Sequence, residues 1–231
     1  MHPASHKIKY MRILSFNNAQ ELANKTEVLM REFCESKKDL LRGFFPTGKS
    51  AEALYANLRN DRFWQQKFQG LQIDEFAQPN HLYLSTHQSQ IIQPLQLEDQ
   101  FETIDPTWTE QQMNAHIQNV ISHKIDFALL GFGPNGHIGF HEPGQGDQKF
   151  LGGTVNLTEQ SFKRVKGATT RTAMTFGAGS FLKAEKIFLI ATGEEKEPTF
   201  RKFLDSRPTS ELPATLLKDH ADFTVLTTFK V

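Results

Sequence analysis

Short apolar runs and longer amphipathic segments alternate along the chain. Runs typical of β-strands span residues 11–16, 40–45, 71–73, 125–130, 173–176, 187–191 and 223–228. Apolar residues at helical spacing predict helices. The first follows a cap at Asn17 or Asn18, and the others span 51–58, 81–95, 109–123, 197–204 and 210–218. The helix at 81–95 is expected to break near Pro94. Strands that alternate with helices are typical of a largely parallel sheet covered on both faces. We therefore expect an α/β fold built on a doubly wound, mostly parallel, Rossmann-like sheet.

No internal repeat, low-complexity linker or change of composition divides the chain. We therefore expect residues 1–231 to form a single domain, with residues 1–10 as a candidate flexible end. Residues 144–153 are polar and glycine-rich, and they suit either a mobile loop at the edge of a site or an ordinary surface loop.

The overall charge argues against one class of function. Lysine plus arginine equals aspartate plus glutamate, at 26 each in 231 residues, so the chain lacks the basic excess of a nucleic-acid-binding protein. No apolar run approaches the ~18 residues of a membrane span, and the first ten residues lack the apolar core of a secretory signal. We expect a cytoplasmic protein with neither a nucleic-acid nor a membrane partner. The oligomeric state stays open, and a homo-oligomer is compatible with the sequence.

The most specific motif is a glycine-rich turn after the apolar run at 125–130. Its sequence from residue 129, L-L-G-F-G-P-N-G-H-I-G-F-H-E-P-G, presents His137 and, shortly after it, Glu142. A histidine and a carboxylate at the carboxyl end of a strand could form a proton-transfer pair. Open α/β sheets bind ligands in the crevice beyond those strand ends. Taken alone, the histidine could equally be a structural residue of a tight turn.

This stretch resembles the signature of the glucosamine-6-phosphate deaminase/isomerase family, which reads G-x-G-x-D-G-H-I-A-F-N-E-P. That family belongs with the galactosamine-6-phosphate isomerases and 6-phosphogluconolactonases in one superfamily. The matching residues are Gly131, Gly133, Gly136, His137, Ile138, Phe140, Glu142 and Pro143. The chain departs from the signature with Asn135 in place of aspartate and His141 in place of asparagine.

The resemblance implies roles for several residues of this turn. His137 would assist opening of the sugar ring, Glu142 and Asn135 would support it, and Gly133 and Gly136 would lie in the substrate-binding loop. An asparagine can hold an imidazole by a hydrogen bond but, unlike aspartate, cannot stabilise its charged form. The exchange at position 135 therefore bears directly on rate and substrate preference.

Residues 47–50, T-G-K-S, separate a strand-like run from a helical segment. Free backbone N–H groups at the start of a helix, together with hydroxyls, favour a phosphate, whereas Ser50 could also be a plain helix cap. The resemblance identifies this place with the family's phosphate loop, T-G-G-T/S-P or T-G-S-S-P. It implies Thr47, Gly48, Lys49 and Ser50 as phosphate ligands, with Lys49 either adding charge or facing solvent.

Asp74 and Glu75 follow the short apolar run at 71–73. A carboxylate at the carboxyl end of a strand is placed to act as a base, although an acidic pair is more often a solvated turn. The pair is similar to the family's D-E-Y or D-E-W motif. That resemblance implies that Asp74 moves the proton between C2 and C1 of the sugar.

Basic residues that could anchor a phosphate occur in two places. Lys196 in G-E-E-K follows the strand-like run at 187–191 and is similar to the family's G-x-x-K, whose lysine binds the substrate phosphate; any lysine can also be part of a solvated helix start. The family's second anchor, an arginine, has no matching local sequence. Arg164, Lys166 and Arg171 are the candidates, and we select Arg171 because R-T-A-M-T is similar to an R-x-T-x-T element of the lactonases.

The resemblance covers most of the chain, including the tail element S-E-L-P-A-T-L-L at 210–217. It implies isomerisation and deamination of glucosamine or galactosamine 6-phosphate to a ketohexose 6-phosphate and ammonia, a hydrolase reaction at a C–N bond in amino-sugar catabolism. The substrate partner is a sugar phosphate, and neither a metal nor any other cofactor is implied. The C-terminus is short for an allosteric member, so no such site is expected. The alternatives are a 6-phosphogluconolactonase or a sugar-phosphate-binding protein with weakened catalysis.

Overall fold

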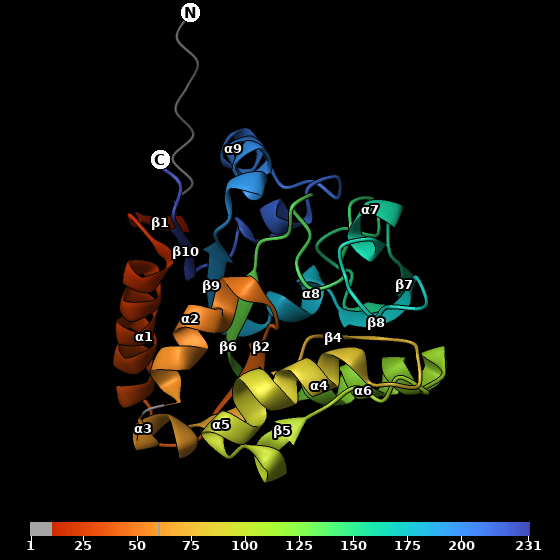
Figure 1. Cartoon of the computed structure of the whole chain (residues 1–231), viewed down its shortest axis with the longest axis horizontal. Helices are drawn as coiled ribbons and strands as arrows, with labels where there is room; N and C mark the ends of the chain where they lie inside the picture. The colour runs from red at the N-terminus through yellow and green to blue at the C-terminus, as the bar shows by residue number, and fades with distance from the viewer. Residues whose placement is uncertain (1–10, 60) are drawn as a thin grey trace, which may run out of the picture.

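A parallel sheet of seven strands forms the centre of the part of the chain that the computed structural model describes, residues 11–59 and 61–231 (Figure 1). The expected flexible end, residues 1–10, lies outside the described residues. In sheet order the strands are β1 (Met11–Ser15), β10 (Phe223–Thr227), β9 (Ala184–Ala191), β6 (Ile125–Gly131), β2 (Leu41–Phe45), β3 (Phe68–Gln72) and β5 (Phe101–Glu102). Every neighbouring pair is parallel. The prediction of a mostly parallel α/β sheet is confirmed.

Helices cover both faces of this sheet. They are α1 (Ala19–Glu35), α2 (Lys49–Leu58), α3 (Arg62–Gln65), α4 (Leu82–His87), α5 (Gln93–Leu95), α6 (Glu110–Ser122), α7 (Glu159–Phe162), α8 (Ala178–Phe181) and α9 (Glu197–Asp205). Single turns of other helix types are the π-helical η1 (Gln88–Ile92) and the 3-10 helices η2 (Glu98–Gln100), η3 (Glu194–Lys196) and η4 (Pro213–Leu217).

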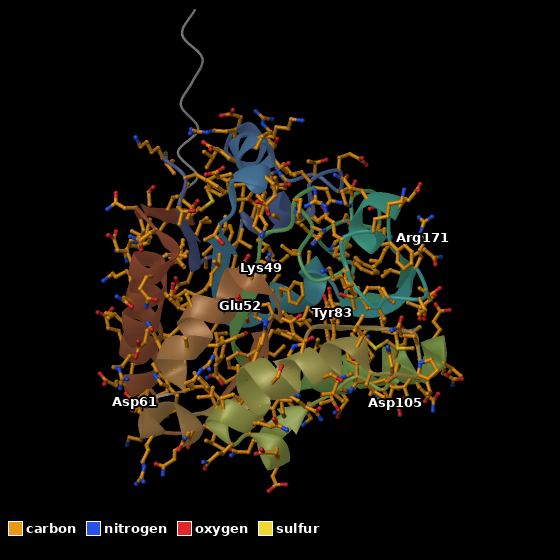
Figure 2. The ribbon with its side chains drawn as sticks, viewed as in Figure 1. Lys49, Glu52, Asp61, Tyr83, Asp105 and Arg171 are labelled. Carbon is orange, nitrogen blue, oxygen red and sulfur yellow. The ribbon has the colours of Figure 1, made fainter. Side chains whose placement is uncertain are left out.

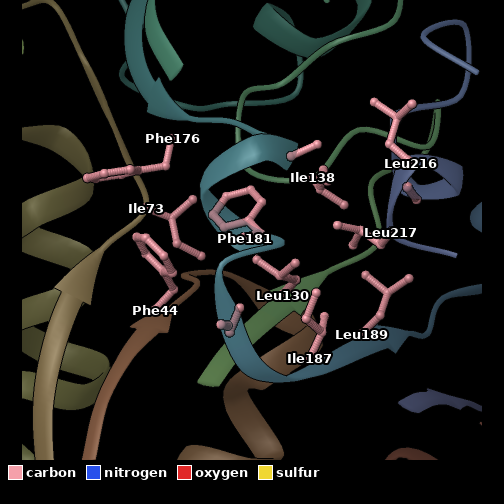
Figure 3. Packing of buried hydrophobic residues seen from close by; sticks show 14 of the residues in the cluster. Phe44, Ile73, Leu130, Ile138, Phe176, Phe181, Ile187, Leu189, Leu216 and Leu217 are labelled. Carbon is pink, nitrogen blue, oxygen red and sulfur yellow. The ribbon is translucent and has the colours of Figure 1, made fainter. Parts of the chain in front are cut away.

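The alternation of side chains along the strands builds two separate apolar layers. Phe44, Leu130 and Leu189 point to the face covered by α6, α8, α9 and η4, where Figure 3 shows them packed beside Phe181 and Leu217. Their neighbours in sequence point to the opposite face, covered by α1 and α2. Successive residues of a strand face opposite sides of a sheet, so these buried strands are apolar throughout, as parallel sheets require.

Several helix boundaries follow from local chemistry. Asn18 caps α1, its Oδ1 accepting the Glu21 N–H at 2.9 Å, which confirms one of the two expected caps. Thr109 and Gln112 form a reciprocal capping box at the start of α6. In each case the residues that decide the boundary are close neighbours in sequence.

Two helical expectations need correction. The break expected near Pro94 is instead the π-helical turn η1, which precedes the proline; a residue without an N–H cannot continue the regular bonding pattern of the helix. The helix expected over 210–218 is the shorter 3-10 helix η4. Pro213 opens it, and the Thr215 hydroxyl donates to the Leu212 carbonyl at 2.7 Å, which tightens the turn.

A second, antiparallel sheet was not predicted. It pairs β4 (Asp74–Phe76) with β8 (Thr172–Phe176), and β8 with β7 (Gly152–Asn156). The strand expected at 173–176 therefore exists but belongs to this sheet. The last two residues of the expected loop at 144–153 belong to strand β7. Residues 152–156 pair with β8 and alternate between more and less exposed positions, as a strand does.

No helix in the described part of the chain is long and apolar enough to cross a membrane.

A buried lysine ties α9 to η4. Lys218 is 2% exposed, and its Nζ donates to the carbonyl oxygens of Phe203, of Leu204 at 3.1 Å and of Ser206 at 2.6 Å, at the end of α9. A cation at a helix C-terminus is favourable because the last carbonyls carry partial negative charge.

We expect Lys218→Met to lower the free energy of unfolding by about 3 kcal/mol, because buried carbonyls would lose their donor. Urea unfolding at neutral pH measures the change. The exposed Lys202 of α9 provides the control: Lys202→Met is expected to change stability by less than about 0.5 kcal/mol. Equal effects of the two substitutions would show that the buried ammonium contributes nothing specific.

Candidate active site

The residues singled out by their sequence motifs gather at the carboxyl edge of the parallel sheet. Residues 47–50 follow β2, the turn at 131–142 follows β6, and Lys196 follows β9. Because β2, β6 and β9 are neighbours in the sheet and run the same way, the segments after them emerge side by side. This edge is where open parallel sheets bind ligands.

The turn after β6 places an imidazole against a buried carboxylate. His137 Nδ1 lies 3.2 Å from Glu142 Oε1, an ion-pair contact that falls short of well-aligned hydrogen-bond geometry. The other carboxylate oxygen accepts the Asn135 Nδ2–H at 3.1 Å and the Thr158 hydroxyl at 2.7 Å. The Asn135 side-chain oxygen accepts the backbone N–H of His137 at 3.2 Å, so this amide links the Glu142 carboxylate to the backbone of His137.

Glycines shape this turn for two reasons. Gly136 has φ of 82°, the left-handed region that favours glycine. The His137 ring lies directly over Gly133, where an added Cβ would come within 2.3 Å of it. The turn closes through the Gly133 N–H, which donates to the His137 carbonyl at 2.9 Å. The backbone therefore leaves just enough room to seat the imidazole.

Glu142 keeps its negative charge although it is fully buried. Burial raises the pKa of a carboxyl group, but the His137 imidazole and the Ser161 and Thr158 hydroxyls outweigh it and lower the pKa of Glu142 to about 2. The carboxylate is therefore ionised across the physiological range. Thr158 carried no motif that pointed to this contact; its only sequence signal was that of a helix cap, which it also is for α7.

His141, the second departure from the family signature, contacts the start of α8. It is fully buried, and its Nδ1 accepts the Ala178 N–H at 3.1 Å. Burial is the main reason that its pKa falls to about 4, so the ring is neutral at physiological pH. His141 therefore supports the backbone beside Glu142 and the start of α8.

Asp74 opens β4, in the antiparallel sheet, and is 6% exposed. The solvated turn pair considered for Asp74 and Glu75 is therefore wrong, since Glu75 is fully buried too. An added Cβ on Gly139 would sit 3.4 Å from Asp74 Oδ2, so the Asp74 carboxyl faces the turn that carries His137. Burial, and then the charge of Glu75, raise the pKa of Asp74 well above its ordinary value.

Glu75 has a structural task that the sequence did not reveal. Its carboxylate accepts the backbone N–H groups of Tyr83 at 2.9 Å and Leu84 at 2.7 Å, in the first turn of α4. A carboxylate at a helix N-terminus satisfies N–H groups that have no partner within the helix. Only the fold brings residue 75 to the start of α4, so the motif alone could not separate the roles of the two acids.

The loop after β2 and the lysine after β9 meet across the sheet. Lys196 Nζ donates to Ser50 Oγ at 2.9 Å. Gly48, with φ of 96°, is the residue that caps α2, and Ser50 lies within the helix, so the alternative role of Ser50 as a plain helix cap is wrong. Burial lowers the pKa of Lys196, the charge of Glu195 raises it, and that of Arg164 lowers it further. Hydroxyl, helix N-terminus and ammonium together suit a phosphate.

The remaining cationic candidates lie in different surroundings. Lys49 is exposed. Arg171 is also exposed, and its Nε donates to the Leu157 carbonyl at 2.7 Å; Figure 2 shows it well to the side of Lys49. The structure thus does not bring Arg171 to the Ser50–Lys196 pair. The arginine whose charge reaches Lys196 is Arg164.

No group of three or more His, Cys, Asp or Glu side chains among the residues described could hold a metal ion.

Comparison with known sequences identifies the family. The sequence profile described as glucosamine-6-phosphate isomerases/6-phosphogluconolactonase matches residues 18–226, and the chain belongs to this family. Proteins of Exiguobacterium sibiricum and Enterococcus faecalis, both named glucosamine-6-phosphate deaminase, are 28% and 27% identical over 228 and 232 residues. Each alignment covers 94% of this chain, and 90% and 96% of the relative.

Comparison with solved structures supports the same fold. A monomeric glucosamine-6-phosphate deaminase has a TM-score of 0.84 at 24% identity, covering 94% of this chain and 97% of its own. The 6-phosphogluconolactonase of Leishmania guyanensis has a TM-score of 0.76 at 16% identity, covering 94% and 95%. At these identities the likeness concerns the fold, which deaminases and lactonases share.

We expect Glu142→Gln to remove an acid-dependent part of the stability. An unfolded glutamate titrates near 4.5, so the lowered pKa stabilises the folded protein fully above pH 4.5, and this stabilisation is lost as the pH falls towards 2. It amounts to about 3 kcal/mol. Urea unfolding at pH 6 and pH 3 should show the difference between wild type and Glu142→Gln shrinking at the lower pH.

The exposed Glu32 of α1 serves as the control, because Glu32→Gln is expected to leave both stabilities within about 0.5 kcal/mol. A constant difference between wild type and Glu142→Gln from pH 6 to pH 3 would contradict the assignment of a buried charge.

Proposed function

We propose that this protein, acting through a single domain, deaminates and isomerises a hexosamine 6-phosphate to a ketohexose 6-phosphate and ammonia. Glucosamine 6-phosphate is the first candidate because the curated relatives are named for it. The observation that carries the proposal is the convergence of a buried acid, an imidazole–carboxylate pair and a cationic phosphate site on one edge of the sheet. Family membership alone would leave deaminase and lactonase equally open.

The phosphate of the substrate would lie between the start of α2 and Lys196. Ser50 Oγ already accepts from Lys196 Nζ at 2.9 Å, and Gly48 and Thr47 supply the preceding turn. A fixed phosphate holds the sugar at one end and places its reacting carbons at a defined distance. Arg164 would add positive charge to this end of the site.

His137 would transfer the proton that opens the sugar ring. Its Nδ1 faces Glu142, so Nε2 is the nitrogen left to exchange a proton with the sugar. The buried negative charge of Glu142 stabilises the imidazolium that forms when the ring takes up that proton. Asn135 holds the Glu142 carboxylate and the backbone of His137 in place but contributes no charge.

Asp74 would abstract the proton at C2 and deliver it to C1. A buried carboxylate with a raised pKa is a stronger base than an exposed one, and its carboxyl group faces the His137 turn. Abstraction of the C2 proton gives an enolamine, and return of the proton to C1 gives an imine at C2. Water then adds to this imine, and ammonia leaves to give the ketose. The electrons that move come from the substrate's own C–H bond and amine, so the reaction needs no oxidant.

Ammonia release from glucosamine 6-phosphate and from galactosamine 6-phosphate, measured side by side, tests the proposal. We expect Asp74→Asn to lower kcat/KM at least ~10²-fold, because the proton transfer would lose its base. Circular dichroism confirms that the variant is folded. Hydrolysis of 6-phosphogluconolactone without release of ammonia would assign the lactonase reaction instead, and sugar-phosphate binding without turnover would show a binding protein.

We expect Asn135→Asp to move the acidic limb of the kcat/KM–pH profile to higher pH. The new carboxylate would lie about where Asn135 Nδ2 now sits, 3.1 Å from Glu142 Oε2, and added negative charge raises the pKa of a nearby imidazole. Asn135→Ala is the control, since it removes both hydrogen bonds without adding charge and should leave that limb in place. If the acidic limb of the profile did not move in Asn135→Asp, residue 135 would have no influence on the proton transfer.

A further inference from the structure

A buried histidine lies between the two halves of the site. His87 is the last residue of α4 and is fully buried. Its Nε2 lies 3.0 Å from the Phe45 carbonyl oxygen, and its Nδ1 lies 2.9 Å from the Tyr83 carbonyl oxygen. Neither the family signature nor the proton transfers described above account for this residue.

The two carbonyl groups belong to segments with separate tasks. Phe45 ends β2 and is separated by Pro46 alone from the phosphate loop, residues 47–50. Tyr83 lies in the first turn of α4, whose N–H groups are held by Glu75, the neighbour of Asp74. One imidazole therefore lies between the strand end that starts the phosphate loop and the helix anchored beside the proposed base.

The next turn of the same segment makes a second contact with the phosphate loop. Gln90, in the π-helical turn η1, accepts the Gly48 N–H on its Oε1 at 3.1 Å. Its Nε2 lies 3.4 Å from Glu52 Oε1 of α2. Residues three positions apart lie on the same side of a helix, so His87 and Gln90 can reach the same loop.

We propose that His87 and Gln90 brace the phosphate loop and so set its position relative to Asp74. They are positioning residues, because they act through the backbone of Phe45 and Gly48 rather than on the substrate. The inference rests on the proposed function, in which the phosphate is held at one end of the sugar and the base acts at the other. A small error in the distance between the phosphate loop and Asp74 would lower the rate of catalysis steeply.

The chemistry of the ring defines a matched pair of substitutions. A carbonyl oxygen only accepts, and a neutral imidazole has one N–H to donate, so it can satisfy only one of the two carbonyls at a time. The amide of glutamine places its NH₂ near the position of Nε2, and that of asparagine near Nδ1. His87→Gln can therefore keep the bond to Phe45, whereas His87→Asn can keep only the bond to Tyr83.

Calorimetric titration with inorganic phosphate measures the affinity of the phosphate loop for its ligand without requiring turnover. We expect His87→Asn and Gln90→Ala to weaken phosphate binding about tenfold or more, and His87→Gln to stay within about threefold of wild type. Gln88, exposed in the same turn, is the control, and Gln88→Ala should bind as wild type does. In the ammonia assay kcat/KM should follow the same order.

Urea unfolding separates positioning from general stability. The inference holds if His87→Gln and His87→Asn are equally stable but differ in phosphate binding, and it is overturned if they bind phosphate equally. If neither variant folds, Gln90→Ala carries the test: weaker binding supports the brace. Unchanged binding overturns it, as does tighter binding, which would mean that Gln90 competes with phosphate for the Gly48 N–H.

Failure of the proposed function gives a different pattern. Wild-type protein that binds phosphate but releases no ammonia would refute the deaminase while leaving the comparison of the variants valid. Wild-type protein that binds neither phosphate nor the hexosamine phosphates would overturn both.

Discussion

The parallel pairing of β6 with β2 on one side and β9 on the other is the constraint on which the candidate site depends. Each of these strands is followed by a short segment that carries a polar group, and parallel pairing makes all three segments emerge at one edge. The contact between Ser50 and Lys196, which are 146 residues apart in sequence, is a direct result. Antiparallel pairing of any of these strands would send its loop to the opposite edge.

The site is held by buried polar groups as much as by the apolar layers beneath it. Glu142 lies out of reach of water and keeps its charge only because Asn135, Thr158 and His137 surround it. Glu75 is compensated in the same way by the first turn of α4. Buried charges are tolerated when hydrogen bonds replace the lost water. Asp74 has the opposite environment, and burial together with the charge of Glu75 favours its protonated form.

This difference gives two acids of the same sheet edge different chemical characters. Glu142 is a permanent negative charge that can support an imidazole, whereas the surroundings of Asp74 raise its pKa and favour its protonated form. Groups whose environments separate their pKa values in this way are suited to different steps of one proton-transfer reaction. Asn135 fits the same scheme, since a neutral amide beside Glu142 avoids repulsion between two carboxylates.

The amino-acid sequence by itself determined the features that depend on near neighbours. The apolar run of β6, the buried face of α2 and the Asn18 cap of α1 were predicted from spacing within one element, because the residues that decide them are a few positions apart. The glycine-rich turn could be recognised as a place for His137 and Glu142 for the same reason. The parallel direction of the central strands was also predicted, because strands that alternate with helices are typical of a parallel sheet.

Only the tertiary structure decided the contacts between distant segments. The antiparallel sheet that seats Asp74 joins residues about a hundred positions apart, and its strands carry no local signal that distinguishes them from parallel ones. The capping of α4 by Glu75, the position of His87 between two carbonyl groups, and the effect of the Arg164 charge on Lys196 have the same origin. Each depends on how two segments pack, and the free energy of that packing is a property of the whole core rather than of either sequence segment.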